Sequence, residues 1–421
     1  LDASSHDYFN ASVLASPFVY PKHKQNRHGA LSFAPGGLGP AAGIEIIRSH
    51  QFPDEAQGRF MANQLSGGFR GTRWFDIQDR GSSYAVTQVD PPLLVSSDPH
   101  FRPIAMNFGP DGALYLVDFY SPLIENTSEP KRALGRDHMH GRIWRIRHKG
   151  RPLRPQPQIA SESVPTLIEL LQDAEERTRE LARRELHERG AEAVLPHVNT
   201  WTSQLDRTKA DHERHLLEAL WLHQAFEDVN SALLSTLLDA KDPRARAAAT
   251  RVLRFWQDRI DNSLSLLEPL VEDDDAKVRL QALLACGFDG SSRARAVMLR
   301  VTRHAMDDGL RHALDDTTQA FDRRGVAATL PGFPEGDAYV LRRIPSSRLV
   351  TMKRGASVCR EIATRSGLDA SLRRDALATS AQRKGPTFIA ELLDALATTS
   401  HEGTTRQDVR ADLIQLLMAR P

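Results

Sequence analysis

The pattern of apolar and polar positions changes once along the chain and divides it into a β part and a helical part. Over residues 43–146, apolar side chains largely alternate with polar ones, the period of strands with one solvated face. From Ser163 onward, apolar residues recur with the period of amphipathic helices. The sequence therefore predicts a multidomain chain that is all-β first and helical afterwards.

The clearest strand signals flank the turn sequence Gly-Pro-Asp-Gly at 109–112. Its proline and glycines supply the fixed and the positive φ of a tight turn between two antiparallel strands. Residues 141–146 alternate isoleucine with arginine and predict a third strand. Because successive strands run in opposite directions, Arg102, Asp118 and the segment 136–140 are expected at one end of this sheet. The turn is expected at the other end.

Shorter segments before this hairpin predict one more sheet of the same kind. Strands are expected at 43–47, within 52–63, at 68–78 and at 83–89. Pro91 and Pro92 are expected to interrupt the ladder after Val89, since proline cannot donate a ladder hydrogen bond.

An internal repeat runs through the helical part. Residues 171–179, 238–246 and 271–279 each carry an acidic turn followed by a segment that ends in arginine. Their spacing predicts a missing copy at 211–214 and a repeat of two helices, which is an α-solenoid. The acidic turn should start the second helix, where carboxylates favour the positive helix end. The terminal arginine resembles that of HEAT repeats.

These patterns define the expected organisation of the chain. The proline content of the linker favours extended backbone, and the helical part is expected to fold on its own. The segments are an irregular lead-in at 1–42, the β part at 43–150, a Pro-rich linker at 151–162, HEAT-like repeats at 163–325, a loop at 326–346 and further helical repeats at 347–421.

Composition and charge narrow the classes of function. The 421 residues include 55 Lys and Arg against 54 Asp and Glu, a balance that gives no support for a nucleic-acid partner. No apolar run approaches the ~18 residues of a membrane span. The two cysteines, Cys286 and Cys359, form no Cys-x-x-Cys pair, so these residues carry no cysteine zinc site or c-type haem motif. Because the chain opens at Leu1 without methionine or a leader, we expect a fragment or a processed product.

One ordered series of residues resembles a known family. It comprises Phe101-Arg102-Pro103, the turn at 109–112, Asp118-Phe119-Tyr120 and residues 136–146. The series resembles the last propeller blade of the membrane-bound dehydrogenase-like proteins of planctomycetes and verrucomicrobia, which are related to glucose/sorbosone dehydrogenases. The resemblance covers roughly residues 50–150. It implies a partial β-propeller of about two blades, followed by an α-solenoid of HEAT-like repeats, in an extracytoplasmic or periplasmic protein.

A propeller needs at least about four blades to close its ring, so three interpretations remain open. The β part is a piece of a larger propeller, which we favour, or a half-sheet resting on the helices, or one side of an assembly with another chain. The chain also departs from the family. Such dehydrogenases often carry His-Gly-Asn-Arg where residues 65–70 here contain no histidine, which places cofactor binding in doubt.

The resemblance implies a candidate site at the predicted sheet end. A histidine near a carboxylate is the usual base for removing the hydroxyl proton of a sugar or alcohol, and arginine binds carboxylate, quinone or sugar oxygens. The alternative is that the aspartates cap turns and the histidines lie on a surface loop. The two histidines stand two positions apart, but no third metal ligand is identifiable, so no metal is expected. The candidates are His138, His140 and Asp118 for catalysis, and Arg102, Tyr120 and Asp137 for substrate binding.

Two functions follow from these observations. The first is the C-terminal portion of a dehydrogenase-like protein that oxidises sugars or other alcohols and passes electrons to a quinone or a cytochrome. The second is a non-catalytic propeller and HEAT-repeat scaffold whose solenoid binds a protein partner. The missing histidine favours the scaffold, whereas the ordered series favours the enzyme.

Overall fold

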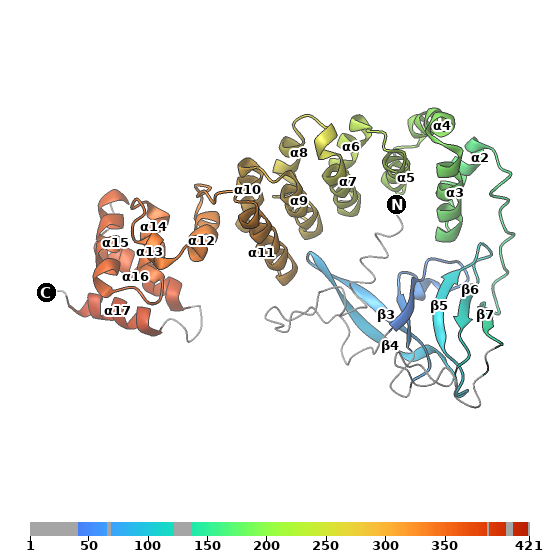
Figure 1. Ribbon diagram of the computed structural model, residues 1–421, viewed down its shortest axis with the longest axis horizontal. Coiled ribbons are helices and arrows are strands. Elements are labelled where there is room, and N and C mark those ends of the chain that lie inside the picture. Colours follow the sequence, from blue (N-terminus) through green and yellow to red (C-terminus); the bar gives the residue numbers. More distant parts are fainter. Residues whose placement is uncertain are drawn as a thin grey trace. The chain divides into compact units, whose positions relative to one another are not determined.

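The computed structural model describes residues 41–64, 69–121, 137, 139–384, 387–400 and 407–419 (Figure 1). The chain forms two compact units. The first runs to Ser263 and includes Asp273–Ala282, and the second comprises Leu264–Glu272 and Leu283–Pro421. Both sheets and the first helices belong to the first unit, so the β part and the start of the helical part are packed as one body.

Two antiparallel sheets make up the β part of the first unit. The four-stranded sheet has the order β1-β2-β3-β4, with β1 Ala41–Ile46, β2 Phe60–Gln64, β3 Gly71–Arg80 and β4 Ser83–Val95. The three-stranded sheet has the order β5-β6-β7, with β5 Pro103–Phe108, β6 Leu114–Asp118 and β7 Arg142–Ile146. The predicted meander around the Gly-Pro-Asp-Gly turn is confirmed. Within the described residues the two sheets are open and do not close into a ring.

Strand β4 continues beyond its predicted end. We expected Pro91 and Pro92 to stop the ladder, but pairing resumes after them and reaches Val95. The register jumps from Trp74 opposite Val89 to Thr72 opposite Leu94. This irregularity lets both prolines leave the ladder without ending the strand.

The Gly-Pro-Asp-Gly turn is packed against the rest of the first unit. Gly112 adopts a φ of +82°, and a Cβ there would lie 2.5 Å from Cε1 of His50. Only glycine therefore fits both the backbone conformation and the space. Next to the turn, Phe108 and Leu114 pack against Met61 and other apolar residues of the four-stranded sheet. This end of the second sheet is thus buried, and its opposite end carries the predicted site.

A group of hydrogen bonds joins the β part to the first helices; we call it the junction, made of His50, Gln51, Arg151, Arg154, Asp173 and Glu175. Glu175 is 1% exposed, accepts a 2.7 Å hydrogen bond from the backbone N of His50 and also contacts Nδ1 of its ring. Both Nη atoms of Arg154 donate to Asp173.

The Pro-rich segment takes part in the junction as well. Nη1 of Arg151 donates to the carbonyls of His50 and Phe52 at 2.6 and 2.8 Å, and Nε2 of Gln51 donates to the carbonyl of Pro152 at 2.7 Å. The junction therefore fixes the loop after β1, the segment after β7 and the turn before the next helix. The domain boundary predicted at 151–162 stays a prediction. The hydrogen bonds of the junction connect the segments on its two sides.

Paired helices follow in each unit. Helices α2 Val164–Glu169, α3 Glu176–Arg189, α4 Ala191–Gln204, α5 His212–Ala225, α6 Ser231–Leu238 and α7 Pro243–Trp256 lie in the first unit. Helices α8 Ser263–Leu270 and α9 Ala276–Asp289 contribute residues to both. The second unit continues with α10 Ser292–Met298, α11 Asp308–Arg323, α12 Pro334–Arg343, α13 Ser346–Leu349, α14 Ala356–Thr364, α15 Ala370–Lys384, α16 Phe388–Ser400 and α17 Gln407–Met418. Short 3₁₀ segments are η1 Asp54–Ala56, η2 Leu170–Gln172, η3 Gln257–Arg259 and η4 Leu299–Arg303.

Helices α3, α7 and α9 confirm the predicted starts of the second helix in each repeat. Helix α5 begins within residues 211–214, where the missing copy of the motif was predicted. The loop predicted over 326–346 is wrong at 334–343, where α12 forms. Its proline stands in the first turn, where no intrahelical N–H is required. Acidic residues begin this helix and arginines end it, which suits the helix dipole.

The arginine that ends each repeat motif has a structural role, and we call these residues the repeat arginines: Arg179, Arg246 and Arg279. Each Nη1 turns back and donates to the carbonyls six and five residues earlier, at 2.5–3.2 Å. These bonds hold the acidic turn closed onto the helix that follows it. Arg373 of α15 is fully buried and makes related bonds, in which its Nη1 donates to the carbonyls of Arg365 and Ala363, eight and ten residues earlier, at the end of the preceding helix.

Strand β1 carries a carboxyl group with an altered proton affinity. Burial raises the pKa of Glu45 from 4.5 to about 7, and the neighbouring carboxylate of Glu180 on α3 adds to the rise. The hydrogen bond from the backbone N of Ile46, together with Arg177 and Arg48, opposes the rise only in part. Glu45 thus marks the place where the first sheet approaches the helices.

Removing a repeat arginine should destabilise the first unit. Arg246→Ala deletes two turn hydrogen bonds and a bidentate pair with Asp273, whose side chain is 11% exposed. We expect a loss of about 2–3 kcal/mol in unfolding free energy, measured by urea denaturation followed by circular dichroism. Arg244→Ala is the matched control, because that side chain on the same helix is 85% exposed and should cost no more than about 0.5 kcal/mol. Equal losses in the two variants would contradict the structural role.

Candidate functional site

The predicted site lies at the end of the second sheet opposite the Gly-Pro-Asp-Gly turn. A depression of about 650 Å³ opens there, bordered by the end of β6, the start of β7 and the residues that precede β7. Its polar lining includes Asp118, Asp137, His140 and Arg142. The structure thus brings three of the predicted residues to one surface, and adds Arg142.

Asp118 is the centre of this sheet end, and its carboxylate is fully occupied by the fold. The residue is 1% exposed and stands opposite Pro103 of β5 and Arg142 of β7. Its Oδ1 accepts hydrogen bonds from the backbone N of Arg102 at 2.8 Å and of Tyr120 at 3.0 Å. Its Oδ2 accepts from Nε1 of Trp144 at 3.1 Å and lies 2.9 Å from Nε of Arg142. This arrangement is that of a structural cap that closes both loops at the sheet end.

Arg102 and Tyr120 are placed by that cap and do not line the depression. Arg102 is 5% exposed, and its Nη1 donates to the carbonyl of Phe101 at 2.8 Å. Burial lowers the pKa of its guanidinium, and the nearby Arg70 lowers it further. Tyr120 holds a left-handed φ of 50°, which non-glycine residues rarely adopt. The strain is held by the bond from Tyr120 to Asp118.

Arg142 is a site residue that reasoning from the sequence missed. Its Nη2 donates to Asp98 at 2.7 Å, and its guanidinium lies 3.8 Å from the centre of the Tyr120 ring. The hydrogen bond from Arg142 lowers the pKa of the Asp98 carboxyl. The alternation of β7 was a signal for this residue, since it places Arg142 opposite Asp118 once the pairing of β6 and β7 is known.

Asp137 and His140 form the accessible polar pair of the depression. Oδ1 of Asp137 accepts from the backbone N of Met139 at 2.8 Å and of His140 at 3.1 Å. Its Oδ2 lies 2.8 Å from Nδ1 of His140, whose side chain is 74% exposed. These hydrogen bonds, the one from Met139 first, lower the pKa of Asp137. His138 lies outside the described residues.

This arrangement can orient an imidazole, and it offers little else for chemistry. An aspartate that holds Nδ1 leaves the other ring nitrogen of His140 to take or give a proton. Phe119, Met139 and Ile143 add exposed apolar surface to the same depression. Among the described residues, no group of three or more His, Cys, Asp or Glu side chains is arranged to hold a metal ion.

Comparison with known families identifies two segments. Residues 4–150 match the model of a domain of unknown function (DUF7133), and residues 230–315 match HEAT repeats. No curated protein matches the chain. The helical part therefore contains HEAT-like repeats, as the repeat motif indicated, and neither match names an activity. No helix in the described part of the chain has the length and apolar character needed to span a bilayer.

Replacing Asp118 by asparagine should destabilise the protein rather than only alter a surface. Asparagine turns one acceptor of this cap into a donor and removes one of the two carboxylates, Asp118 and Asp98, that face Arg142. We expect a loss of about 2–4 kcal/mol in unfolding free energy, read from chemical denaturation. Asp54→Asn is the control, since that side chain is 97% exposed and should change stability by less than about 0.5 kcal/mol. If Asp118→Asn leaves the unfolding free energy unchanged, the fold does not need this carboxylate, and a catalytic role for it becomes the better interpretation.

Proposed function

We propose that the chain is a binding scaffold whose HEAT-like helices take up a segment of a protein partner. HEAT-like repeats suit this role because stacked helix pairs provide extended surfaces. The β part, held to the first helices by the junction, is then a structural and binding module of the same scaffold.

An apolar surface on the last two helices carries this proposal. We call it the α16–α17 face, made of Ile389, Leu393, Ile414, Leu417 and Met418. These side chains are 36–77% exposed, although α16 and α17 bury other apolar residues, Leu392 and Leu413 among them, in their common core. Ile389 and Leu393 stand four positions apart on α16, so they share one side of that helix. Ile414, Leu417 and Met418 stand three and four positions apart on α17, so they share one side of that helix in the same way. Exposed apolar side chains that share one side of a helix mark protein interaction sites.

The sheet end supports the same conclusion by its own chemistry. The carboxylate of Asp118 is used by the cap, and that of Asp137 accepts two backbone N–H groups. Acids and bases used in catalysis must be able to reach a substrate. Of the described polar groups at this sheet end, His140 alone combines high exposure with an orienting carboxylate.

Apolar-to-polar changes on the α16–α17 face should release the partner. In the unaltered chain, we expect mass spectrometry to detect chemical cross-links between this face and a bound protein. Leu393→Ser with Ile414→Ser should abolish these cross-links, because the interface loses its apolar anchors. Ile143→Ser is the matched control: this side chain is 72% exposed but lies on β7. Retained cross-links in the double variant, with loss in Ile143→Ser, would move the binding site to the sheet.

A second function, oxidation of a sugar or other alcohol, is supported by the pair Asp137–His140. In this proposal His140 accepts the hydroxyl proton, and the carbon that bears the hydroxyl loses its hydrogen as a hydride. The two electrons of that hydride would pass to a quinone or, one at a time, to a cytochrome, as the family resemblance implies. The two sheets would then be blades of a propeller, in an extracytoplasmic protein. The described residues do not form a quinone site, because Arg142 is already engaged by Asp98, Asp118 and Tyr120. No step is therefore assigned to that group.

The oxidation proposal has its own test. Asp137→Asn should lower the rate of dye reduction with aldose or alcohol substrates by about a hundredfold, since the imidazole loses its orienting carboxylate. The melting temperature should change little, as it should in the control Asp54→Asn, which should keep full activity. Absence of substrate-dependent dye reduction in the unaltered protein would leave the scaffold as the function of this chain.

A further inference from the structure

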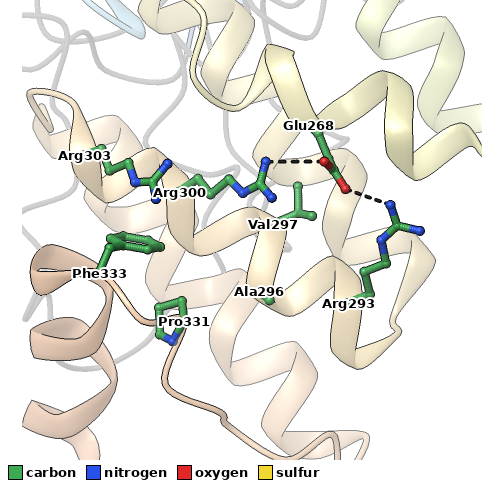
Figure 2. A pocket seen from close by; sticks show the side chains of 8 residues that line it. All are labelled: Glu268, Arg293, Ala296, Val297, Arg300, Arg303, Pro331 and Phe333. Atoms are coloured by element: carbon green, nitrogen blue, oxygen red, sulfur yellow. Dashed lines mark hydrogen bonds and ion pairs between the residues drawn. The ribbon is translucent and has the colours of Figure 1, made fainter. Parts of the chain in front are cut away.

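A basic pocket lies within the second unit, and none of the residues that line it belongs to the α16–α17 face. We call it the arginine pocket; it encloses about 420 Å³ between the end of α8, the helices α10 and η4, and the loop before α12. Figure 2 shows Glu268 between Arg300 and Arg293, with Phe333 and Pro331 on the side of α12. Three arginines therefore share one cavity with an apolar wall.

The arginines of this pocket are held by weak, exposed ion pairs. Nη2 of Arg293 donates to Glu268 at 2.8 Å, and Nη1 of Arg300 lies 3.4 Å from the other oxygen of the same carboxylate. Nη1 of Arg303 donates to Glu272 at 2.9 Å. Three guanidinium groups thus meet two carboxylates, and the pocket keeps an excess positive charge.

This use of arginine differs from that of the repeat arginines. The side chains of the repeat arginines Arg179 and Arg246 are 10% and 18% exposed, and the Nη1 of each donates hydrogen bonds to carbonyls of the acidic turn. The side chains of Arg293, Arg300 and Arg303 are 62%, 34% and 43% exposed. A guanidinium carries five N–H donors, so each retains donors for a ligand beside its resident carboxylate. Exposed ion pairs contribute little to stability, so a further carboxylate can share these donors at small cost.

The other wall of the pocket fixes the kind of ligand. The guanidinium of Arg303 lies 4.2 Å from the centre of the Phe333 ring, which holds the arginine against an apolar surface. Val297 and Pro331 extend that surface. A ligand that fills the pocket must therefore present a carboxylate and an apolar group side by side. Glu268 and Glu272 would repel a polyanion such as nucleic acid, whereas a single carboxylate matches the excess charge.

We propose that the arginine pocket binds an acidic segment of a partner protein. One carboxylate of the segment takes the free donors of Arg300 and Arg303, as planar guanidinium groups bind carboxylates in a fork. A neighbouring apolar side chain of the segment packs on Phe333 and Pro331. The proposal rests on the proposed scaffold function and adds the chemistry of the partner.

The test uses a short fluorescent peptide in which glutamates alternate with leucines, titrated with the full chain and followed by fluorescence anisotropy. A peptide with glutamine in place of glutamate should bind at least about tenfold more weakly, because it offers no charge to the arginines. Arg300→Ala with Arg303→Ala should weaken the glutamate peptide by at least about tenfold. Arg311→Ala is the matched control: it removes an arginine that is 62% exposed on α11 of the same unit, and should leave binding unchanged.

A single variant guards against loss of folding. Arg293→Ala alters a side chain that is 62% exposed and should weaken binding with an unchanged circular dichroism spectrum. Equal binding of the glutamate and glutamine peptides, or unchanged binding in all pocket variants, overturns the proposal.

The two proposals fail separately. If the pocket variants bind the glutamate peptide as well as the unaltered chain does, while Leu393→Ser with Ile414→Ser still releases the partner, the arginine-pocket proposal is refuted and the scaffold function stands. If the peptide binds as expected but those variants keep their partner, the α16–α17 face is refuted and the pocket stands.

Discussion

The hydrogen bonds that Glu175 and Asp173 accept are the interaction on which the first unit depends. Both carboxylates stand in the turn before α3, and Glu175 is almost fully buried. A buried charge is costly unless it is paired and hydrogen-bonded, so His50 and Arg154 must stay in place for the unit to fold. Their position fixes the loop after β1, and through Gly112 the buried end of the second sheet. The opposite end of that sheet, with Asp118 and His140, therefore lies away from the junction.

Charged side chains in this protein divide by exposure into those that build the fold and those that can meet a ligand. The carboxylate of Asp118 and the repeat arginines are engaged by backbone groups within their own surroundings. His140 and the arginines of the pocket keep part of their hydrogen-bonding capacity in solvent. This difference in exposure explains why residues that look equally suited to catalysis or binding in the sequence have different roles in the structure. Some stabilise the fold, and others remain accessible to a ligand.

Local signals in the sequence were sufficient for most elements. The turn at 109–112, its flanking strands and the acidic starts of α3, α7 and α9 depend on neighbouring residues, and all formed as predicted. Helix α12 was missed because proline and glycine suggested a loop, although a proline suits a first turn. A further copy of the repeat arginine, Arg373, follows Asp369 at the motif's spacing and could have been found from it.

Contacts between distant segments could not be predicted in this way. His50 and Glu175 are 125 residues apart, and no periodicity links them. The role of Arg142 required the register of β7 against β6, and the exposure of Asp137 and His140 required the shape of the surface. Asp118, Asp137 and His140 therefore lie at one sheet end, as strand alternation predicted, but which of these residues support the fold and which remain accessible could be seen only in the folded geometry.

The half-buried carboxyl of Glu45 makes the stability of the first unit depend on pH. Its pKa rises from 4.5 to about 7 on folding, so the folded chain holds a proton that the unfolded chain has released between these values. Folding within this window takes up a proton from solution. The stability that this proton contributes is complete below pH 4.5 and falls as pH rises towards about 7. Through this one carboxyl group, the first unit is thus more stable in mildly acidic solution than at neutral pH.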